Sequence, residues 1–182
     1  MLLSLSTVSS SIAATKITTE VLPQSGTDTT YEDTTESFVH SIDVRPLQYS
    51  DDDKLTSGSF WPLNYYRNSR YLEVNFFNSS GENAIPANSK VKRVNLVMEY
   101  TSLNAPLKKA HIKVFDGKNW SKKKKVRLPE VGSDRIQTIN ITKAVKSAYR
   151  ANNLSIRFQA YSLAPTQTAI DQIKEVITYV PR

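Results

Sequence analysis

Residues 94–100 read VNLVMEY, a stretch in which almost every second residue is apolar. Successive side chains of a β-strand point to opposite faces. One face therefore carries Val94, Leu96, Met98 and Tyr100, and the other carries Asn95 and Glu99. Such one-sided alternation is typical of an antiparallel sheet that has one face on a core and the other in water. The stretch therefore predicts a strand of an antiparallel β-structure.

The same alternation recurs in residues 71–77, 110–114 and 154–160, and residues 173–180 are β-branched and aromatic enough for a central strand. Turn-type residues separate these runs. Together they predict an all-β fold, a two-sheet antiparallel β-sandwich of the jelly-roll type, with one short helix over residues 142–151 and an extended N-terminal arm. The residues expected to be buried lie on the apolar sides of the strands: Leu72, Val74, Leu96, Met98, Ile112, Val114, Ile156, Phe158, Ile177 and Tyr179.

The chain of 182 residues is long enough for one domain with a hydrophobic core. Its composition divides it into three parts. Residues 1–14 are apolar and rich in serine, residues 15–36 form a threonine-rich acidic arm, and residues 37–182 form the expected sandwich domain. The arm is short of large apolar groups and would not fold as an isolated segment. Its most β-compatible part is residues 17–22.

The start of the chain has two interpretations. Residues 11–14 (SIAA) are small and apolar, as at the cleavage site of a secretory signal, but no basic residue precedes them. Residues 1–14 are therefore either the remnant of a signal peptide or an apolar strand. The signal interpretation predicts an extracellular or cell-surface location. The sequence contains no run of eighteen apolar residues and so no candidate transmembrane segment.

Charge is unevenly distributed along the chain. Residues 1–60 contain three Lys/Arg and nine Asp/Glu, whereas residues 61–182 contain 21 Lys/Arg and eight Asp/Glu. Opposite charges attract, either within one chain or between neighbouring chains. We therefore expect the arm, through Ile17, Val21 and Leu22, to add as a strand to an open sheet edge of a neighbouring subunit. Repeated head to tail, this contact would build a filament.

The side chains that usually carry catalysis are sparse. The chain has no cysteine, two histidines and five glycines, and it contains no nucleophile elbow, phosphate loop or nucleotide fingerprint. We therefore expect no enzymatic activity and no cofactor, although a glycosidase with paired carboxylates would not need histidine. Asp51 and Asp53 could supply oxygen ligands to calcium, but a solvated acidic turn is the simpler explanation of both.

The most basic run of the sequence consists of Lys122, Lys123, Lys124 and Lys125. Ammonium groups in a row could bind an anionic glycan, a teichoic acid or a nucleic acid. Lysine is also frequent on the outermost strands of sheets, where its charge prevents edge-to-edge aggregation. The run is thus either a site for an anionic partner or a protected edge strand, and the second interpretation is the stronger.

An aromatic cluster, which includes Trp61, Tyr65, Tyr66 and Arg67, lies between two expected strands. Aromatic rings stack on sugar rings, and arginine bonds sugar hydroxyls or carboxylates. These four residues are the best glycan-site candidates in the sequence. The alternative is that they pack in the core, since a sandwich core also needs large aromatic residues.

A family resemblance rests on four stretches: VNLVMEYTS, HIKVFDG at residues 111–117, IQTINITKAVKSAYRANNLSIRFQA at residues 136–160, and IDQIKEVITYV at residues 170–180. They resemble secreted bacterial and archaeal jelly-roll domains of the galactose-binding-like type, the DNRLRE surface modules among them. The resemblance follows the strand pattern and no invariant motif. It implies a sandwich fold and an extracellular setting, and it transfers no catalytic residue.

These observations favour a non-catalytic, extracellular structural or adhesive surface protein that assembles with itself through its N-terminal strand. The first alternative is a carbohydrate-binding module that uses the region of Trp61. The second is a viral capsid or fibre jelly roll, but genome-packing arms are usually basic, whereas this N-terminal region is acidic. The expected partner is a second copy of the chain or a surface polysaccharide, and we expect no specific nucleic acid.

Overall fold

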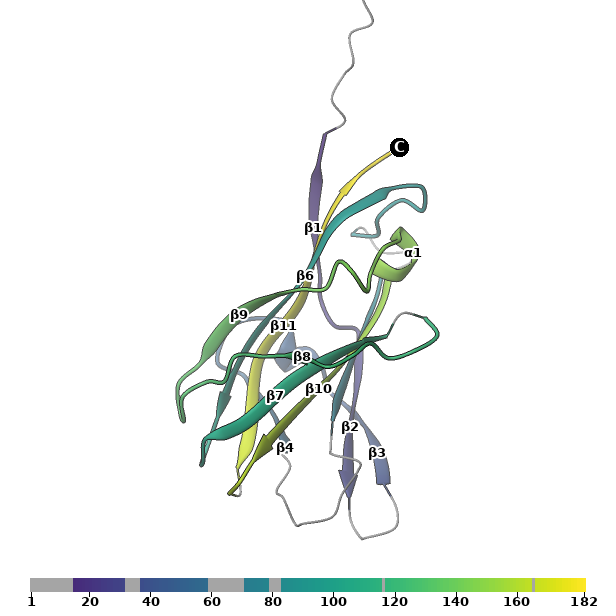
Figure 1. Ribbon diagram of the computed structural model, residues 1–182. Helices are drawn as coiled ribbons and strands as arrows, with labels where there is room; N and C mark the ends of the chain where they lie inside the picture. The colour runs from purple at the N-terminus through teal and green to yellow at the C-terminus, as the bar shows by residue number, and fades with distance from the viewer. Residues whose placement is uncertain (1–14, 32–36, 59–70, 79–82, 116, 165) are drawn as a thin grey trace, which may run out of the picture.

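The computed structural model describes residues 15–31, 37–58, 71–78, 83–115, 117–164 and 166–182. Two antiparallel β-sheets pack face to face, and β1 and the C-terminus lie at the same end of the molecule (Figure 1). The five-stranded sheet runs in the order β1 (Ile17–Val21), β11 (Gln167–Val180), β6 (Lys90–Ser102) and β9 (Arg135–Asn140), and β4 (Leu55–Gly58) also pairs with β11.

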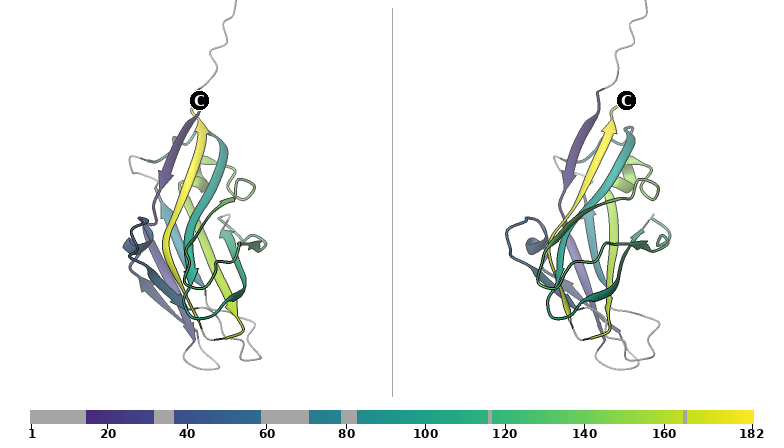
Figure 2. Two further views of the ribbon diagram at one scale, coloured as in Figure 1. Left: turned by 90° about the vertical axis from the view of Figure 1, so that its left-hand side faces the viewer. Right: turned by 60° about the vertical axis from the view of Figure 1, so that its left-hand side comes forward.

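The six-stranded sheet lies against the first one, as the side views show (Figure 2). Its order is β3 (Ser37–Ile42), β2 (Ser25–Tyr31), β5 (Leu72–Phe77), β10 (Asn153–Ser162), β7 (Leu107–Phe115) and β8 (Lys124–Lys125). A 3-10 turn, η1 (Arg45–Leu47), and one short helix, α1 (Ala148–Ala151), complete the elements of the described residues. The expected all-β antiparallel sandwich with one short helix is confirmed.

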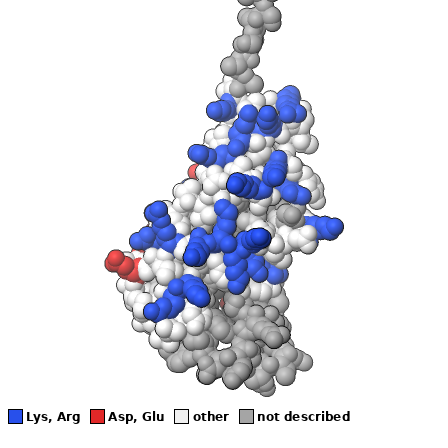
Figure 3. All heavy atoms as spheres, viewed as in Figure 1, with Lys and Arg blue, Asp and Glu red and all other residues white. Residues whose placement is uncertain are grey.

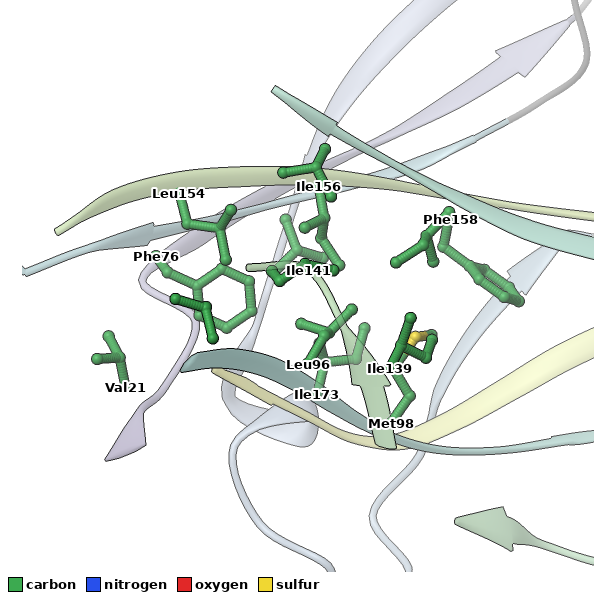
Figure 4. Close-up of a cluster of buried hydrophobic side chains, with 14 of the residues drawn as sticks. Val21, Phe76, Leu96, Met98, Ile139, Ile141, Leu154, Ile156, Phe158 and Ile173 are labelled. Carbon is green, nitrogen blue, oxygen red and sulfur yellow. The ribbon is translucent and has the colours of Figure 1, made fainter. Parts of the chain in front are cut away.

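The core lies between the two sheets and is formed by the alternating residues of the strands. All ten residues expected to be buried on the apolar sides of the strands are buried. Figure 4 shows Phe76, Ile156 and Phe158 from the six-stranded sheet facing Leu96 and Met98 from the other. Burial of such side chains contributes about 1.5–3 kcal/mol each, so this interface is the main source of stability.

The N-terminal segment differs from the prediction. β1 pairs antiparallel with β11 of its own chain, with Ile17 opposite Tyr179, and β2 lies between β3 and β5 inside the six-stranded sheet. The described part of residues 15–36 therefore belongs to its own sandwich, and the prediction of a separate arm is wrong. Threonine is β-branched and suits a strand. Neighbours on both sides of β2 supply the hydrogen bonds that an isolated segment lacks.

The residues assigned to the arm have different surroundings. Val21 is buried in the core, Leu22 is partly buried, and Ile17 is 41% exposed at the outermost strand of its sheet. The next strand, β2, packs closely against its two neighbouring strands at Gly26. A Cβ on Gly26 would lie 2.9 Å from Ile42 Cδ1 and 3.0 Å from the carbonyl oxygen of Glu73, so β2 approaches its neighbours too closely for any side chain at this position.

The helix is shorter than predicted. α1 has four residues, and it is Ser147 that caps it, because the Ser147 Oγ accepts a hydrogen bond from the Arg150 N–H at 3.3 Å. Thr142, the first residue of the predicted helix, accepts instead from the Val94 N–H of β6 at 2.9 Å. Tyr149 of this helix is 72% exposed. Because Thr142 is hydrogen-bonded to β6, the chain forms a turn there and the helix begins only after Ser147.

One acidic side chain lies on the inner face of β11. Glu175 is fully buried, directly opposite Val21 of β1 and Leu96 of β6. Neither of its carboxylate oxygens has a hydrogen-bond partner among the described residues. Burial raises the pKa of Glu175 well above its ordinary value, because a charged group is disfavoured where water and compensating charges are absent. Burial therefore favours the protonated form of this carboxyl in the folded protein.

Candidate functional site

The outer face of the six-stranded sheet brings together polar residues from three neighbouring strands. Arg157 of β10 lies directly opposite Glu73 of β5 on one side and Lys113 of β7 on the other. These side chains point away from the core because their neighbours in sequence, such as Ile156 and Phe158, point into it. The result is a row of charged groups across the middle of a face that is partly open to solvent.

Arg157 is the centre of this row. Its Nε donates to Glu73 Oε2 at 2.8 Å, and the two side chains are 27% and 23% exposed. The guanidinium carbon lies 4.1 Å from the ring centre of Tyr71 and 4.1 Å from that of Trp120. Trp120 also packs on Phe115, with ring centres 5.2 Å apart and planes tilted by 46°. We call these four residues, Tyr71, Arg157, Trp120 and Phe115, the aromatic–arginine stack.

Local structure explains how the rings reach this face. Tyr71 immediately precedes β5, so it lies at the edge of the row formed by Glu73 and its neighbours. Trp120 follows the turn after β7 and returns to Phe115 through an antiparallel bridge. Gly117 has a φ of +92°, a left-handed conformation that glycine adopts without strain. This turn folds Trp120 back over Arg157.

Amide side chains extend the polar surface around the stack. The Asn75 Nδ2 donates to the Ser25 Oγ at 3.3 Å, and the His111 Nε2 lies 2.7 Å from the Gln159 Oε1. Amides, carboxylates and guanidinium groups fixed beside aromatic rings are the groups that recognise sugars. The rings contact the apolar faces of the sugar, and the polar groups bond its hydroxyls. The face can therefore bind a saccharide without any chemical step.

The lysine run lies at the edge of the same sheet. Lys124 and Lys125 form β8, the outermost strand beside β7, and Lys122 and Lys123 precede it; all four are exposed. Lys124 Nζ donates to the carbonyl oxygen of Asn140 in β9 at 2.5 Å, so this run also connects the two sheets. Figure 3 shows many Lys and Arg side chains and few acidic ones on the face where β7, β8 and β9 come forward.

Asp51 and Asp53 lie in an exposed turn before β4. The Asp51 Oδ1 accepts a hydrogen bond from the Asp53 N–H at 3.2 Å, which is a turn-stabilising contact. Asp52, between them, has a φ of 67°. The structure places no three His, Cys, Asp or Glu side chains together as a metal site within its described residues. The turn interpretation accounts for both carboxylates.

The four glycan-site candidates Trp61, Tyr65, Tyr66 and Arg67 lie outside the described residues. Tyr71 is the described aromatic residue that follows them in sequence, and it belongs to the stack. The sequence interpretation missed Trp120 and Arg157. The alternation of residues 154–160 does place Arg157 on the outer side of its strand, but nothing in the sequence reveals that β5 and β10 are neighbours.

A shallow hollow lies at the opposite end of the molecule from β4, between the start of β6 and α1. Its lining includes Ser89, Lys90, Lys146 and Arg182, and it contains no carboxylate side chain. This hollow therefore lacks the acidic pair that a glycosidase would need. In the part of the chain that the structure describes, no helix is both long enough and apolar enough to span a membrane.

Comparisons with known proteins identify no sequence family. No family model matches the chain, and no curated protein matches it. Among solved structures, the chain is similar to a xylan-binding module CBM15, with a TM-score of 0.48 and 12% sequence identity over 93% of this chain and 99% of that one. A likeness at this level gives no information about function. The sheet topology supports the resemblance to galactose-binding-like surface domains only as far as the β-sandwich.

Proposed function

We propose that the protein is a non-catalytic, extracellular carbohydrate-binding module that holds a polysaccharide on the outer face of its six-stranded sheet. The observation that carries this proposal is the guanidinium of Arg157 between the rings of Tyr71 and Trp120, on a face that is open to solvent. Rigid rings at fixed spacing bind a sugar with little loss of conformational freedom, because they are already held in place before the ligand arrives.

The polar groups beside the stack support a sugar ligand in particular. Glu73, Asn75 and Gln159 offer carboxylate and amide groups within two strands of Arg157. Neighbouring strands are about 4.8 Å apart and alternate residues of one strand about 7 Å apart. These spacings match the distances between hydroxyl groups on one or two sugar rings, so a single saccharide unit could contact the stack and an amide together.

Replacement of Trp120 by alanine tests the proposal. We expect Trp120→Ala and Arg157→Ala each to weaken binding to a polysaccharide ligand at least tenfold, because the first removes one ring of the stack and the second removes the guanidinium between the two rings. Binding is measured by affinity electrophoresis through gels containing a panel of plant, algal and microbial polysaccharides. Tyr149→Ala is the matched control, since this tyrosine is exposed on α1, outside the sheet. A wild-type protein that binds no member of the panel, or variants that bind as well as the wild type, would contradict the proposal.

A second candidate function, self-association into a surface assembly, is supported by the position of β1. This strand is the outermost one of its sheet and hydrogen-bonds only to β11 among the described residues. An open edge presents a row of backbone donors and acceptors to which a second copy could add a strand. Because β2 lies inside the six-stranded sheet, a deletion that removes β2 together with β1 would damage the fold.

Single charges at the two outer strands give a cleaner test of self-association. Ile17→Lys places a lysine on β1, and Ile136→Lys places one on β9 at the other edge of the same sheet, where the isoleucine is 65% exposed. If β1 is the contact, Ile17→Lys shifts the assembly to monomers in light scattering and Ile136→Lys does not. A wild-type chain that is monomeric at high concentration would remove this candidate.

A further inference from the structure

The aromatic–arginine stack lies beside a concentration of positive charge. Residues 107–129 contain nine Lys/Arg and a single acidic residue, Asp116. Three of these lysines, Lys113, Lys123 and Lys125, surround His111, and we call these four residues the cationic cluster. No carboxylate among the described residues forms an ion pair with any of the three lysines. Lys123 and Lys125 are exposed and Lys113 is partly exposed, so a ligand can reach their charges.

Strand register connects the cationic cluster to the stack. His111 lies opposite Lys125 on β8 and opposite Gln159 on β10, and Lys113, two residues further on the same face of β7, lies opposite Arg157. A ligand that contacts Arg157 is thus one strand away from Lys113. With strands about 4.8 Å apart, one or two sugar units reach from the stack to the lysines.

The surroundings of His111 confirm that positive charge converges at this point. Burial lowers the pKa of His111, its hydrogen bond to Gln159 opposes that effect, and the charges of Lys123 and Lys113 lower the pKa further. Two nearby lysines create a positive electrostatic potential at the His111 ring, and a bound anion would reduce that potential. His111 is accordingly a natural reporter for an anionic group at this position.

We propose that the polysaccharide is acidic, and that its carboxylate or sulfate groups bind at the cationic cluster while its sugar rings contact the aromatic–arginine stack. This inference rests on the proposed carbohydrate-binding function. Nucleic acid is the competing polyanion, but Glu73 beside Arg157 accepts hydrogen bonds and so favours a ligand that places sugar hydroxyls at the stack. Screening by salt should weaken the interaction, because the lysines are exposed.

Matched pairs of ligands test the inference. Oligogalacturonate and its methyl ester share one backbone and differ in carboxylate charge, and dextran sulfate and dextran differ in the same way for sulfate. We expect at least one acidic ligand to bind at least tenfold more tightly than its neutral partner. NMR follows the two histidine rings of the chain, with His111→Gln to assign them. On binding of an acidic ligand, the pKa of His111 should rise by a measurable amount.

Two sets of lysine variants show which lysines cause the preference for the acidic ligand. The triple change Lys113→Gln, Lys123→Gln and Lys125→Gln should remove the preference for the acidic ligand. The control, Lys90→Gln, Lys92→Gln and Lys146→Gln, makes the same change in net charge at exposed lysines near the other end of the sandwich and should retain the preference.

Each remaining outcome has one meaning. Equal binding of acidic and neutral partners overturns the acidic ligand and leaves the carbohydrate-binding function standing. Absence of binding to all four ligands, together with failure of the wider polysaccharide panel, overturns both. Binding of single-stranded DNA more tightly than either acidic saccharide, lost in the cluster variant, shows that the cluster serves a nucleic acid and also overturns the inference.

Discussion

Replacing Glu175 by glutamine should change how the stability of the protein depends on pH. Glu175 is fully buried and its carboxylate has no hydrogen-bond partner in the described structure. Burial raises its pKa well above the ordinary value of 4.5, so the folded protein keeps a proton that the unfolded chain releases. The stability contributed by this proton is fully present below pH 4.5 and is progressively lost as the pH rises toward the folded pKa.

The size of the effect follows from proton linkage. A group that is protonated when folded and ionised when unfolded lowers the free energy of unfolding by about 1.4 kcal/mol per pH unit. Glutamine has no such proton, so the stability of Glu175→Gln relative to the wild type should increase by up to about 2.8 kcal/mol between pH 5 and pH 7. In a chain of this length, 1 kcal/mol corresponds to about 2–4 °C in Tm.

Urea unfolding at pH 5, 6 and 7 measures this slope. Glu130→Gln is the control, because Glu130 is exposed and this change removes one carboxylate, as Glu175→Gln does. The comparison depends on the change with pH and not on the stability at one pH, since a buried glutamine amide has its own unsatisfied hydrogen bonds. A constant difference between wild type and Glu175→Gln across this range would refute the reasoning and show that the carboxyl ionises freely in the folded protein.

Three further changes test the packing. Phe158→Ala should lower the free energy of unfolding by about 3–5 kcal/mol, because the ring is buried between the sheets, and a loss below 1 kcal/mol would contradict that placement. Gly26→Ala should cost about 1–3 kcal/mol, since its Cβ would lie 2.9 Å from Ile42 Cδ1, and a neutral effect in urea unfolding would mean that β2 and β3 can separate locally. Ser147→Ala should cost about 0.5–2 kcal/mol through loss of the helix cap, unless water replaces the Ser147 oxygen without loss, in which case the measured stability is unchanged.

Period-two alternation was sufficient to predict β5, β6, β7 and β10 and the part of the core that they form. Leu96 and Met98 in β6, and Ile156 and Phe158 in β10, point inward as the apolar pattern indicates, because a shift of one residue would expose every apolar side chain of the strand. The pattern depends only on residues close together in sequence. Such local information is available before any knowledge of which strands are neighbours.

The errors concern contacts between distant parts of the chain. β1 pairs with β11, so Ile17 meets Tyr179, and composition alone could not show that a threonine-rich acidic segment has such a partner. The short helix is a similar case, because the tie between Thr142 and Val94 joins two distant segments. The candidate site depends on register in the same way. Arg157 meets Tyr71 only because β5 and β10 are neighbours.

The outward position of the aromatic–arginine stack distinguishes a binding role from a packing role. Beneath it, Val74, Val114 and Ile156 are fully buried and complete the core without help from the stack. Cation–π contacts at exposed sites contribute about 0.5–1 kcal/mol each, far less than one buried phenylalanine. A packing role would make Trp120→Ala costly to stability. A binding role predicts the reverse, a variant that unfolds almost like the wild type and no longer retains its ligand, because the solvent-facing side of the partly buried stack is covered only when a sugar binds.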